Sequence, residues 1–292
     1  WEIIYRAWTE EVFSYEGRFW SYRDVAIWPR PVQQPHPPVW VPVTGSKETI
    51  EWAGRHNIPI TATKEKLYSI DDNLWGRAIE CGEMEDPWAV PPPGVWQMTR
   101  QTATEPTDVV IGFTEGVPTS VDGVQMGIAE MVATLNDQVG SYGWGRIDMV
   151  ENRRVGIKSR ETYECPASLA LMMAHADLES ICLERDLQRE KSRLEPRYAE
   201  LVYDGLWFSP LKQAMDAFVD ESQRFVTGEV RLRLASGSCQ VTGRRSPHSL
   251  YDYGLATYDA ADSFRHEDSE GFVRLWGRGI QTWAAVQGTR SE

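Results

Sequence analysis

Two stretches of alternating apolar and polar residues constrain the fold most strongly: "DVVIGFTEGVPTSVDG", from residue 108, and "EVRLRLASGSCQVTGR", from residue 229. Each has turn-forming residues near its middle, Glu115–Gly116 in the first and Ser236–Gly237 in the second, so each predicts a β-hairpin. Apolar residues at helical spacing predict helices over residues 128–140, over 168–193 and after Ser209. Long helices set apart from antiparallel hairpins are typical of the α+β class.

The composition narrows the range of partners. The 292 residues carry a net charge of −13, which argues against a nucleic-acid or anionic-membrane partner, because both require a basic face. No apolar run approaches the length that spans a membrane, and the isolated histidines indicate no metal site. Four cysteines without a C-x-x-C pair are typical of reduced thiols and favour the cytoplasm: Cys81, Cys165, Cys182 and Cys239.

The stretch "YSIDDNLWGRAIECGEMEDPW", residues 68–88, opens with a helix-capping pattern. Ser69 stands three residues before Asp72, and this capping-box spacing predicts the N-terminus of a helix. A second interpretation is that the Ser69 hydroxyl and the first amides of that helix bind a small carboxylate. The two interpretations are compatible.

A second polar stretch is "GRIDMVENRRVGIKSRETYECPAS", residues 145–168. A strand that ends in Glu151–Asn152–Arg153, followed by Lys158–Ser159–Arg160 and Tyr163, gathers polar groups as α/β proteins do at ligand sites. Glu151 is suited to pair with an ammonium group, and Tyr163 to bond a carboxylate or ureido oxygen. The alternative is a cluster of surface ion pairs.

From about residue 50 to residue 292 the sequence resembles argininosuccinate synthase. The resemblance is collinear and is carried by long motifs: "NIPITATKEKLYSIDDNLWGRAIECGEMEDPW", "GRIDMVENRRVGIKSRETYECPA", "LEPRYAELVYDGLWFSP", "FVTGEVRLRL" and "GRRSPHSLYDYGLATY". It implies an ATP-dependent carbon–nitrogen ligase that condenses citrulline with aspartate, releasing AMP and pyrophosphate, with magnesium accompanying ATP. Members serve arginine biosynthesis and the urea cycle as cytoplasmic homotetramers.

The resemblance assigns citrulline binding to Ser69, Glu151 and Tyr163, and assigns no catalytic residue. Ala78 stands where the family usually has a second serine that contacts citrulline. The family's Ser-Gly-Gly-x-Asp loop for ATP and its Thr-Gly-Lys-Gly-Asn-Asp stretch for aspartate do not occur in this sequence. No ATP-binding residue is therefore predicted.

The first 48 residues resemble a different family, the luciferase-like flavin-dependent monooxygenases, through "YEGRFW" and "PRPVQQPHPPVWV". We therefore expect a truncated or chimeric chain that is inactive alone. The expected parts are a barrel fragment with α/β character (1–48), a remnant of the nucleotide-binding half (49–106), a synthetase domain (107–265) and a C-terminal oligomerisation helix (266–292). The alternatives are a flavin-dependent monooxygenase and a non-catalytic oligomerising fragment.

Overall fold

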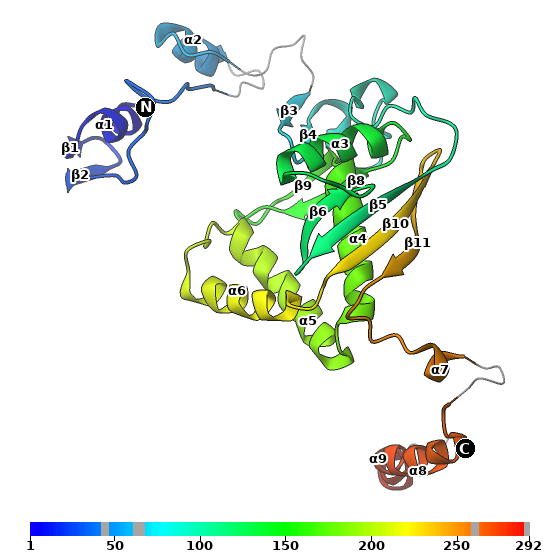
Figure 1. The fold of residues 1–292 in the computed structure, drawn as a ribbon. Helices are drawn as coiled ribbons and strands as arrows, with labels where there is room; N and C mark the ends of the chain where they lie inside the picture. The colour runs from blue at the N-terminus through cyan, green and yellow to red at the C-terminus, as the bar shows by residue number, and fades with distance from the viewer. Residues whose placement is uncertain (42–46, 61–67, 258–262, 289–292) are drawn as a thin grey trace.

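The computed structural model describes residues 1–41, 47–60, 68–257 and 263–288. Figure 1 shows a central body, an N-terminal group of elements and a C-terminal pair of helices. The body combines antiparallel sheets with long helices, which confirms the predicted α+β class. Within the described residues no helix is long and apolar enough to cross a membrane.

Both predicted hairpins form and join in one five-stranded sheet, in the order β11-β10-β5-β6-β7. Glu115 and Gly116 have φ angles of 48° and 78°, which suits the tight turn of a hairpin because positive φ at both positions matches the strand twist. Gly237, at φ 66°, serves the second turn. The strands are β5 Thr107–Thr114, β6 Val117–Val121, β7 Val124–Gln125, β10 Gly228–Ala235 and β11 Ser238–Arg245.

Four helices accompany this sheet: α3 Ile128–Gly140, α4 Pro166–Cys182, α5 Arg185–Tyr203 and α6 Pro210–Gln223. The helix predicted after Ser209 is confirmed, and the Ser209 hydroxyl accepts the backbone N–H of Lys212. The single helix predicted over residues 168–193 is wrong, because the chain turns at Leu183 and a new helix begins after Glu184. The Glu184 side chain accepts the N–H groups of Asp186 and Leu187 and so caps α5.

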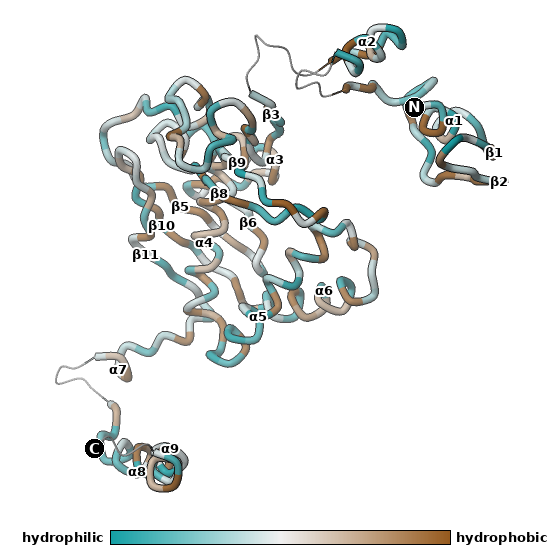
Figure 2. Tube along the Cα trace, turned by 180° about the vertical axis from the view of Figure 1, so that it is seen from behind, coloured by the Kyte–Doolittle hydropathy of each residue, from teal (hydrophilic) through white to brown (hydrophobic). Residues whose placement is uncertain are grey.

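The main core lies between α3, α4 and the inner face of the five-stranded sheet. Alternate residues of β5 and β10 point into it, as the period of a strand requires. Figure 2 shows the hydrophobic residues of these strands together with those of α4. Fully buried members include Ile111, Met131, Leu135, Ala174, Leu178, Leu232 and Leu234.

A second, four-stranded antiparallel sheet has the order β3-β4-β9-β8. One of its faces is covered by the short helices η1 Gly82–Glu85 and η2 Pro93–Val95, and a small core of Ile79, Met84, Val95 and Trp96 lies there. The other face carries the polar residues described below. The strands are β3 Ser69–Asp72, β4 Arg77–Glu80, β8 Arg146–Asn152 and β9 Lys158–Glu164.

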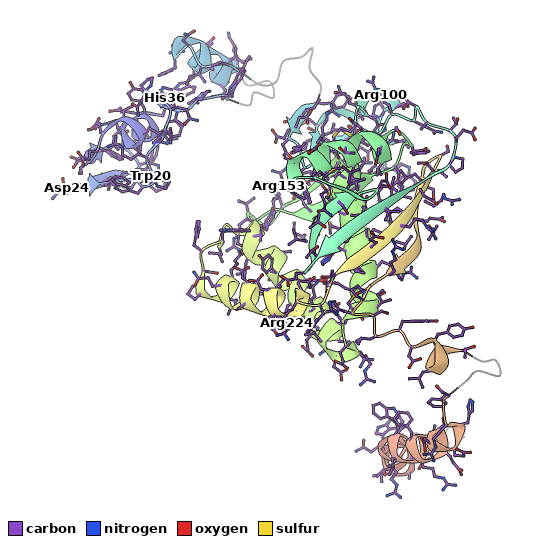
Figure 3. All side chains as sticks on the ribbon, viewed as in Figure 1. Trp20, Asp24, His36, Arg100, Arg153 and Arg224 are labelled. Carbon is purple, nitrogen blue, oxygen red and sulfur yellow. The ribbon has the colours of Figure 1, made fainter. Side chains whose placement is uncertain are left out.

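The terminal groups are small. The N-terminal one contains α1 Glu2–Thr9, β1 Phe13–Glu16, β2 Ser21–Val25 and α2 Lys47–Arg55, and its described strands form a two-stranded sheet rather than a closed barrel. His36, labelled in Figure 3, lies among aromatic rings of this group, with ring centroids 5.5 Å from Tyr5 and 5.9 Å from Trp8. At the other end are α7 Tyr253–Ala256, α8 His266–Trp276 and α9 Arg278–Gln287, with Gly277 between the last two helices.

Candidate functional site

Ser69 lies on strand β3, not at the start of a helix, so the predicted helix is wrong. Its strand pairs antiparallel with β4, and Ser69 stands opposite Glu80. The turn between them is closed by the Asn73 carboxamide oxygen, which accepts the N–H groups of Trp75 and Gly76. Asn73 therefore uses its side chain to make a turn that returns the chain as a hairpin.

The pairing register places all three predicted citrulline-binding residues on one face of the four-stranded sheet. Tyr163 on β9 stands opposite Ala78 on β4, and Glu151 on β8 stands opposite Ser159 on β9. Opposite residues of antiparallel strands share a face, and every second residue of a strand returns to it. This surface is called the site face below, and its residues are Ser69, Asp71, Ala78, Glu80, Ile147, Met149, Glu151, Ser159, Glu161 and Tyr163.

Arg153, labelled in Figure 3, lies just beyond the end of β8. Its guanidinium group links three carboxylates of the site face. Its Nη2 lies 3.1 Å from Glu80 Oε2 and 3.0 Å from Glu161 Oε1. Its Nε donates to Ser159 Oγ at 2.7 Å and lies 3.5 Å from Glu151 Oε1. The single positive charge of Arg153 thus balances only part of the negative charge of the three carboxylates. The remaining negative charge favours a cationic group on a ligand.

The Glu151 side chain is fixed by a hydrogen bond but remains accessible to a ligand. Ser159 Oγ donates to Glu151 Oε1 at 3.2 Å, and the Glu151 side chain keeps 17% of its surface exposed. A carboxylate in this position can accept further hydrogen bonds from a ligand ammonium group. The ammonium-binding role that the sequence suggests for Glu151 stays a prediction.

Tyr163 is half-buried beside Glu161, which is only 8% exposed. The Tyr163 hydroxyl donates a hydrogen bond to Glu161 Oε2. Burial raises the pKa of Tyr163, and the neighbouring Glu161 carboxylate raises it further. Burial also raises the pKa of Glu161, the Tyr163 hydrogen bond lowers it, and the neighbouring Glu151 carboxyl group raises it again.

Glu164, one residue after Tyr163, points to the other face of the sheet and anchors this strand. It is fully buried and accepts from Arg77 Nη1 at 2.8 Å, from Thr99 Oγ1 at 2.7 Å and from two backbone N–H groups. Burial alone would raise the pKa of Glu164, but the hydrogen bonds from Gln97, Thr99 and Arg77 lower it.

Sequence reasoning missed Glu80 and Glu161 as members of the site face. Glu161 stands two residues before Tyr163, so a strand prediction over residues 158–164 would have placed the two on one face. Glu80 likewise stands two residues after Ala78, so a strand prediction over residues 77–80 would have placed these two on one face.

The chain is similar to known argininosuccinate synthases over most of its length. The Arginosuccinate synthase C-terminal domain family matches residues 68–283. Argininosuccinate synthase of Rubrobacter xylanophilus is 51% identical over 242 residues, which are 82% of this chain and 59% of that protein. Argininosuccinate synthase of Bacillus pumilus is 50% identical over 233 residues, which are 79% and 58% respectively.

The chain spans less than two thirds of the length of the curated relatives it matches, even in Chlorobaculum tepidum argininosuccinate synthase, where 260 aligned residues at 46% identity cover 65%. A second family, the Luciferase-like monooxygenases, matches residues 1–74. The similarity that covers most of the chain, including every residue of the site face, is the first. This chain therefore belongs to the argininosuccinate synthase family.

Proposed function

We propose that this chain provides the citrulline-binding surface of an argininosuccinate synthase, the ligase of arginine biosynthesis that condenses citrulline with aspartate in an ATP-dependent reaction. One observation carries the proposal. Ser69, Glu151 and Tyr163, the residues that the family resemblance assigns to citrulline, come from three different strands and share the site face.

The chemistry of the site face suits an amino acid with a neutral polar end. Glu151 offers a carboxylate to the α-ammonium group, and Arg153 and Ser159 hold that carboxylate in place. Ser69 and Tyr163 add hydroxyl groups, which can exchange hydrogen bonds with a ureido group. In such a ligase the protein acts mainly by positioning the reactants and stabilising charge.

The ATP and magnesium of the proposed reaction are not assigned to residues of this chain. Within its described part no group of three or more His, Cys, Asp or Glu side chains has a metal-binding arrangement. The role that the described residues support is therefore the binding of citrulline.

Titration calorimetry with citrulline tests this role. Glu151→Gln removes the charge with little change in shape, and hydrogen bonds to charged groups contribute about 1.5–3 kcal/mol, so we expect affinity to fall about 10- to 100-fold. Glu229→Gln, on strand β10 of the other sheet and paired with Arg245, is the matched control and is expected to bind normally. Failure of the unmodified chain to bind citrulline, or equal binding by Glu151→Gln, would refute the proposal.

A second assay addresses the complete reaction. Pyrophosphate release is measured with ATP, citrulline and aspartate present together. We expect none from this chain alone, since its sequence contains neither of the family's loops for ATP and aspartate. Release at the rate of a complete ligase would show that the chain holds an ATP site of another kind.

We also propose that α8 and α9 pack against further copies of the chain in a homo-oligomer, as a tetramer. Their large apolar side chains are exposed and would be covered in an assembly: Phe272, Val273, Leu275, Trp276, Ile280, Trp283 and Val286. Light scattering from the purified chain tests this, and a monomer would contradict it. The four unpaired cysteines support a cytoplasmic location.

We also keep, as part of this proposal, the predicted boundaries between the parts of the chain, which follow residues 48, 106 and 265. The β3–β4 hairpin precedes residue 107 but is hydrogen-bonded to β9. Limited proteolysis tests whether residues 68–106 separate from the synthetase part. Stable retention of that segment after cleavage would move the boundary toward the N-terminus.

A further inference from the structure

The hydrogen bond between Tyr163 and Glu161 determines what the Tyr163 hydroxyl can offer to a ligand. Both oxygens of the Glu161 carboxylate are engaged, Oε1 by Arg153 Nη2 at 3.0 Å and Oε2 by the Tyr163 hydroxyl. An arginine side chain is always a donor, and an ionised carboxylate is always an acceptor. With Glu161 ionised, the single hydroxyl proton of Tyr163 is directed at Glu161.

The part of Tyr163 that remains available consists of the lone pairs of its oxygen. A phenol has one proton to donate, and that proton is already used. The neighbouring carboxylates Glu80 and Glu151 can only accept hydrogen bonds when ionised, and Arg153 directs Nε to Ser159 and Nη2 to Glu80 and Glu161. The site face around Tyr163 is thus rich in acceptors.

We propose that Glu161 is a positioning residue that fixes the Tyr163 hydroxyl as a hydrogen-bond acceptor, so that Tyr163 receives an N–H group of the ligand. The inference rests on the proposed citrulline-binding function and identifies the kind of ligand atom that meets Tyr163. It replaces the carboxylate or ureido oxygen expected from the sequence, because either would require the proton that Glu161 already holds. Ala78, directly opposite Tyr163, has only a methyl side chain and offers no competing donor.

Citrulline has three nitrogens that carry protons, and each can be removed separately. Nδ-acetylornithine replaces the terminal ureido NH2 by methyl, O-carbamoyl-5-hydroxynorvaline replaces the Nδ–H by oxygen, and 5-ureidopentanoate lacks the α-amino group. Affinities of the unmodified chain and of Tyr163→Phe are compared for citrulline and these analogues. We expect Tyr163→Phe to weaken citrulline binding about 3- to 10-fold, the range of a typical net hydrogen bond, and to have no effect with one of the three analogues. A loss that persists with all three would place a ligand oxygen at Tyr163 and overturn the proposal.

A measurement without ligand tests the role of Glu161 itself. In protein labelled with [13Cζ]tyrosine, the Tyr163 signal is identified by its absence from the spectrum of Tyr163→Phe, and its chemical shift is followed as the pH is raised. Glu161→Gln keeps an acceptor oxygen for Arg153 but removes the negative charge beside the phenol. We expect the Tyr163 hydroxyl to ionise at lower pH in Glu161→Gln. The change should be smaller in Glu80→Gln, because the Glu80 charge raises the pKa of Tyr163 less than the Glu161 hydrogen bond and charge do.

The outcomes separate the two proposals. An unchanged Tyr163 titration in Glu161→Gln would show that Glu161 does not hold the hydroxyl proton, and would overturn the inference even if citrulline binds. Absence of citrulline binding with a shifted titration would refute the proposed function and the ligand assignment. The role of Glu161 in orienting the hydroxyl would then stand by itself.

Discussion

Replacing Glu164 by glutamine is expected to destabilise the four-stranded sheet more than any exchange of a surface charge. Glu164 is 0% exposed and Arg77, its ionic partner, is 2% exposed. Four groups donate to the Glu164 carboxylate: Arg77 Nη1, Thr99 Oγ1 and the backbone N–H groups of Gln97 and Thr99. These bonds join β9, β4 and the segment after η2 at one buried point.

The size of the effect follows from counting acceptors. A glutamine keeps one oxygen and presents an NH2 group where the second oxygen was, so donors that shared that oxygen lose their partner. Each unsatisfied buried polar group costs about 1–3 kcal/mol. Arg77 keeps the Val95 carbonyl at 2.7 Å but loses its buried counter-charge, and breaking a buried ion pair from one side costs about 3–5 kcal/mol. Because these costs overlap, we expect a total loss of about 3–5 kcal/mol.

Urea unfolding followed by circular dichroism measures this loss as a change in the free energy of unfolding. The matched control is Asp108→Asn, since Asp108 pairs with Arg233 across β5 and β10 at a site where the Arg233 side chain is 51% exposed. Exposed pairs contribute about 0–1 kcal/mol. If Glu164→Gln cost no more than this control, the reasoning from buried acceptors would be wrong.

Three further results are expected. Because the folded-state pKa of Glu164 is lowered, its contribution to stability is complete above the unfolded pKa of about 4.3 and is lost as pH falls through the folded pKa; acid titrations of stability should therefore be flatter for Glu164→Gln than for the unmodified chain. Ala78→Ser should tighten citrulline binding by about 1–3 kcal/mol, and an unchanged affinity in calorimetry would contradict this. Glu184→Ala should cost about 1 kcal/mol in urea unfolding, because it leaves two N–H groups of α5 without their cap; an equal loss in Glu190→Ala, on the same helix, would deny Glu184 a capping role.

The hairpins were predictable because their information is local. Alternating residues decide which side of β5 and β10 is buried, and the turn residues Glu115, Gly116 and Gly237 adopt the positive φ angles that such turns require. Helix α6 was predictable for the same reason, since its cap at Ser209 immediately precedes its first turn. In each case the signal and the structure lie within a few residues of each other.

The prediction at Ser69 failed because a local signal was ambiguous. A serine followed by aspartates suits a helix cap, but the Asn73 turn and the β4 partner make the same residues a strand. What secures β4 is Arg77, whose buried carboxylate partner lies 87 residues away in the sequence. No local pattern contains that contact.

The break between α4 and α5 shows a related limit. Apolar spacing continues through Ile181 and Cys182, so periodicity alone extends the helix. The actual stop is an extended residue, Leu183, followed by a cap from Glu184, a residue type that sequence rules do not favour for capping. The Glu184 carboxylate accepts the free N–H groups at the start of α5, although glutamate is not among the residue types preferred at this position.

The same distinction governs the site face. The types of its side chains were readable from the sequence, and Glu151 and Tyr163 were suitable for binding polar ligand groups. Whether each side chain donates a hydrogen bond to a ligand or accepts one could not be predicted from the sequence, since it depends on which neighbouring group holds each proton. Tyr163 donates to one oxygen of Glu161, and Arg153 donates to the other oxygen from beyond the end of another strand. A tyrosine in a binding motif therefore specifies a contact, whereas the hydrogen-bond network around it specifies whether the ligand must donate or accept.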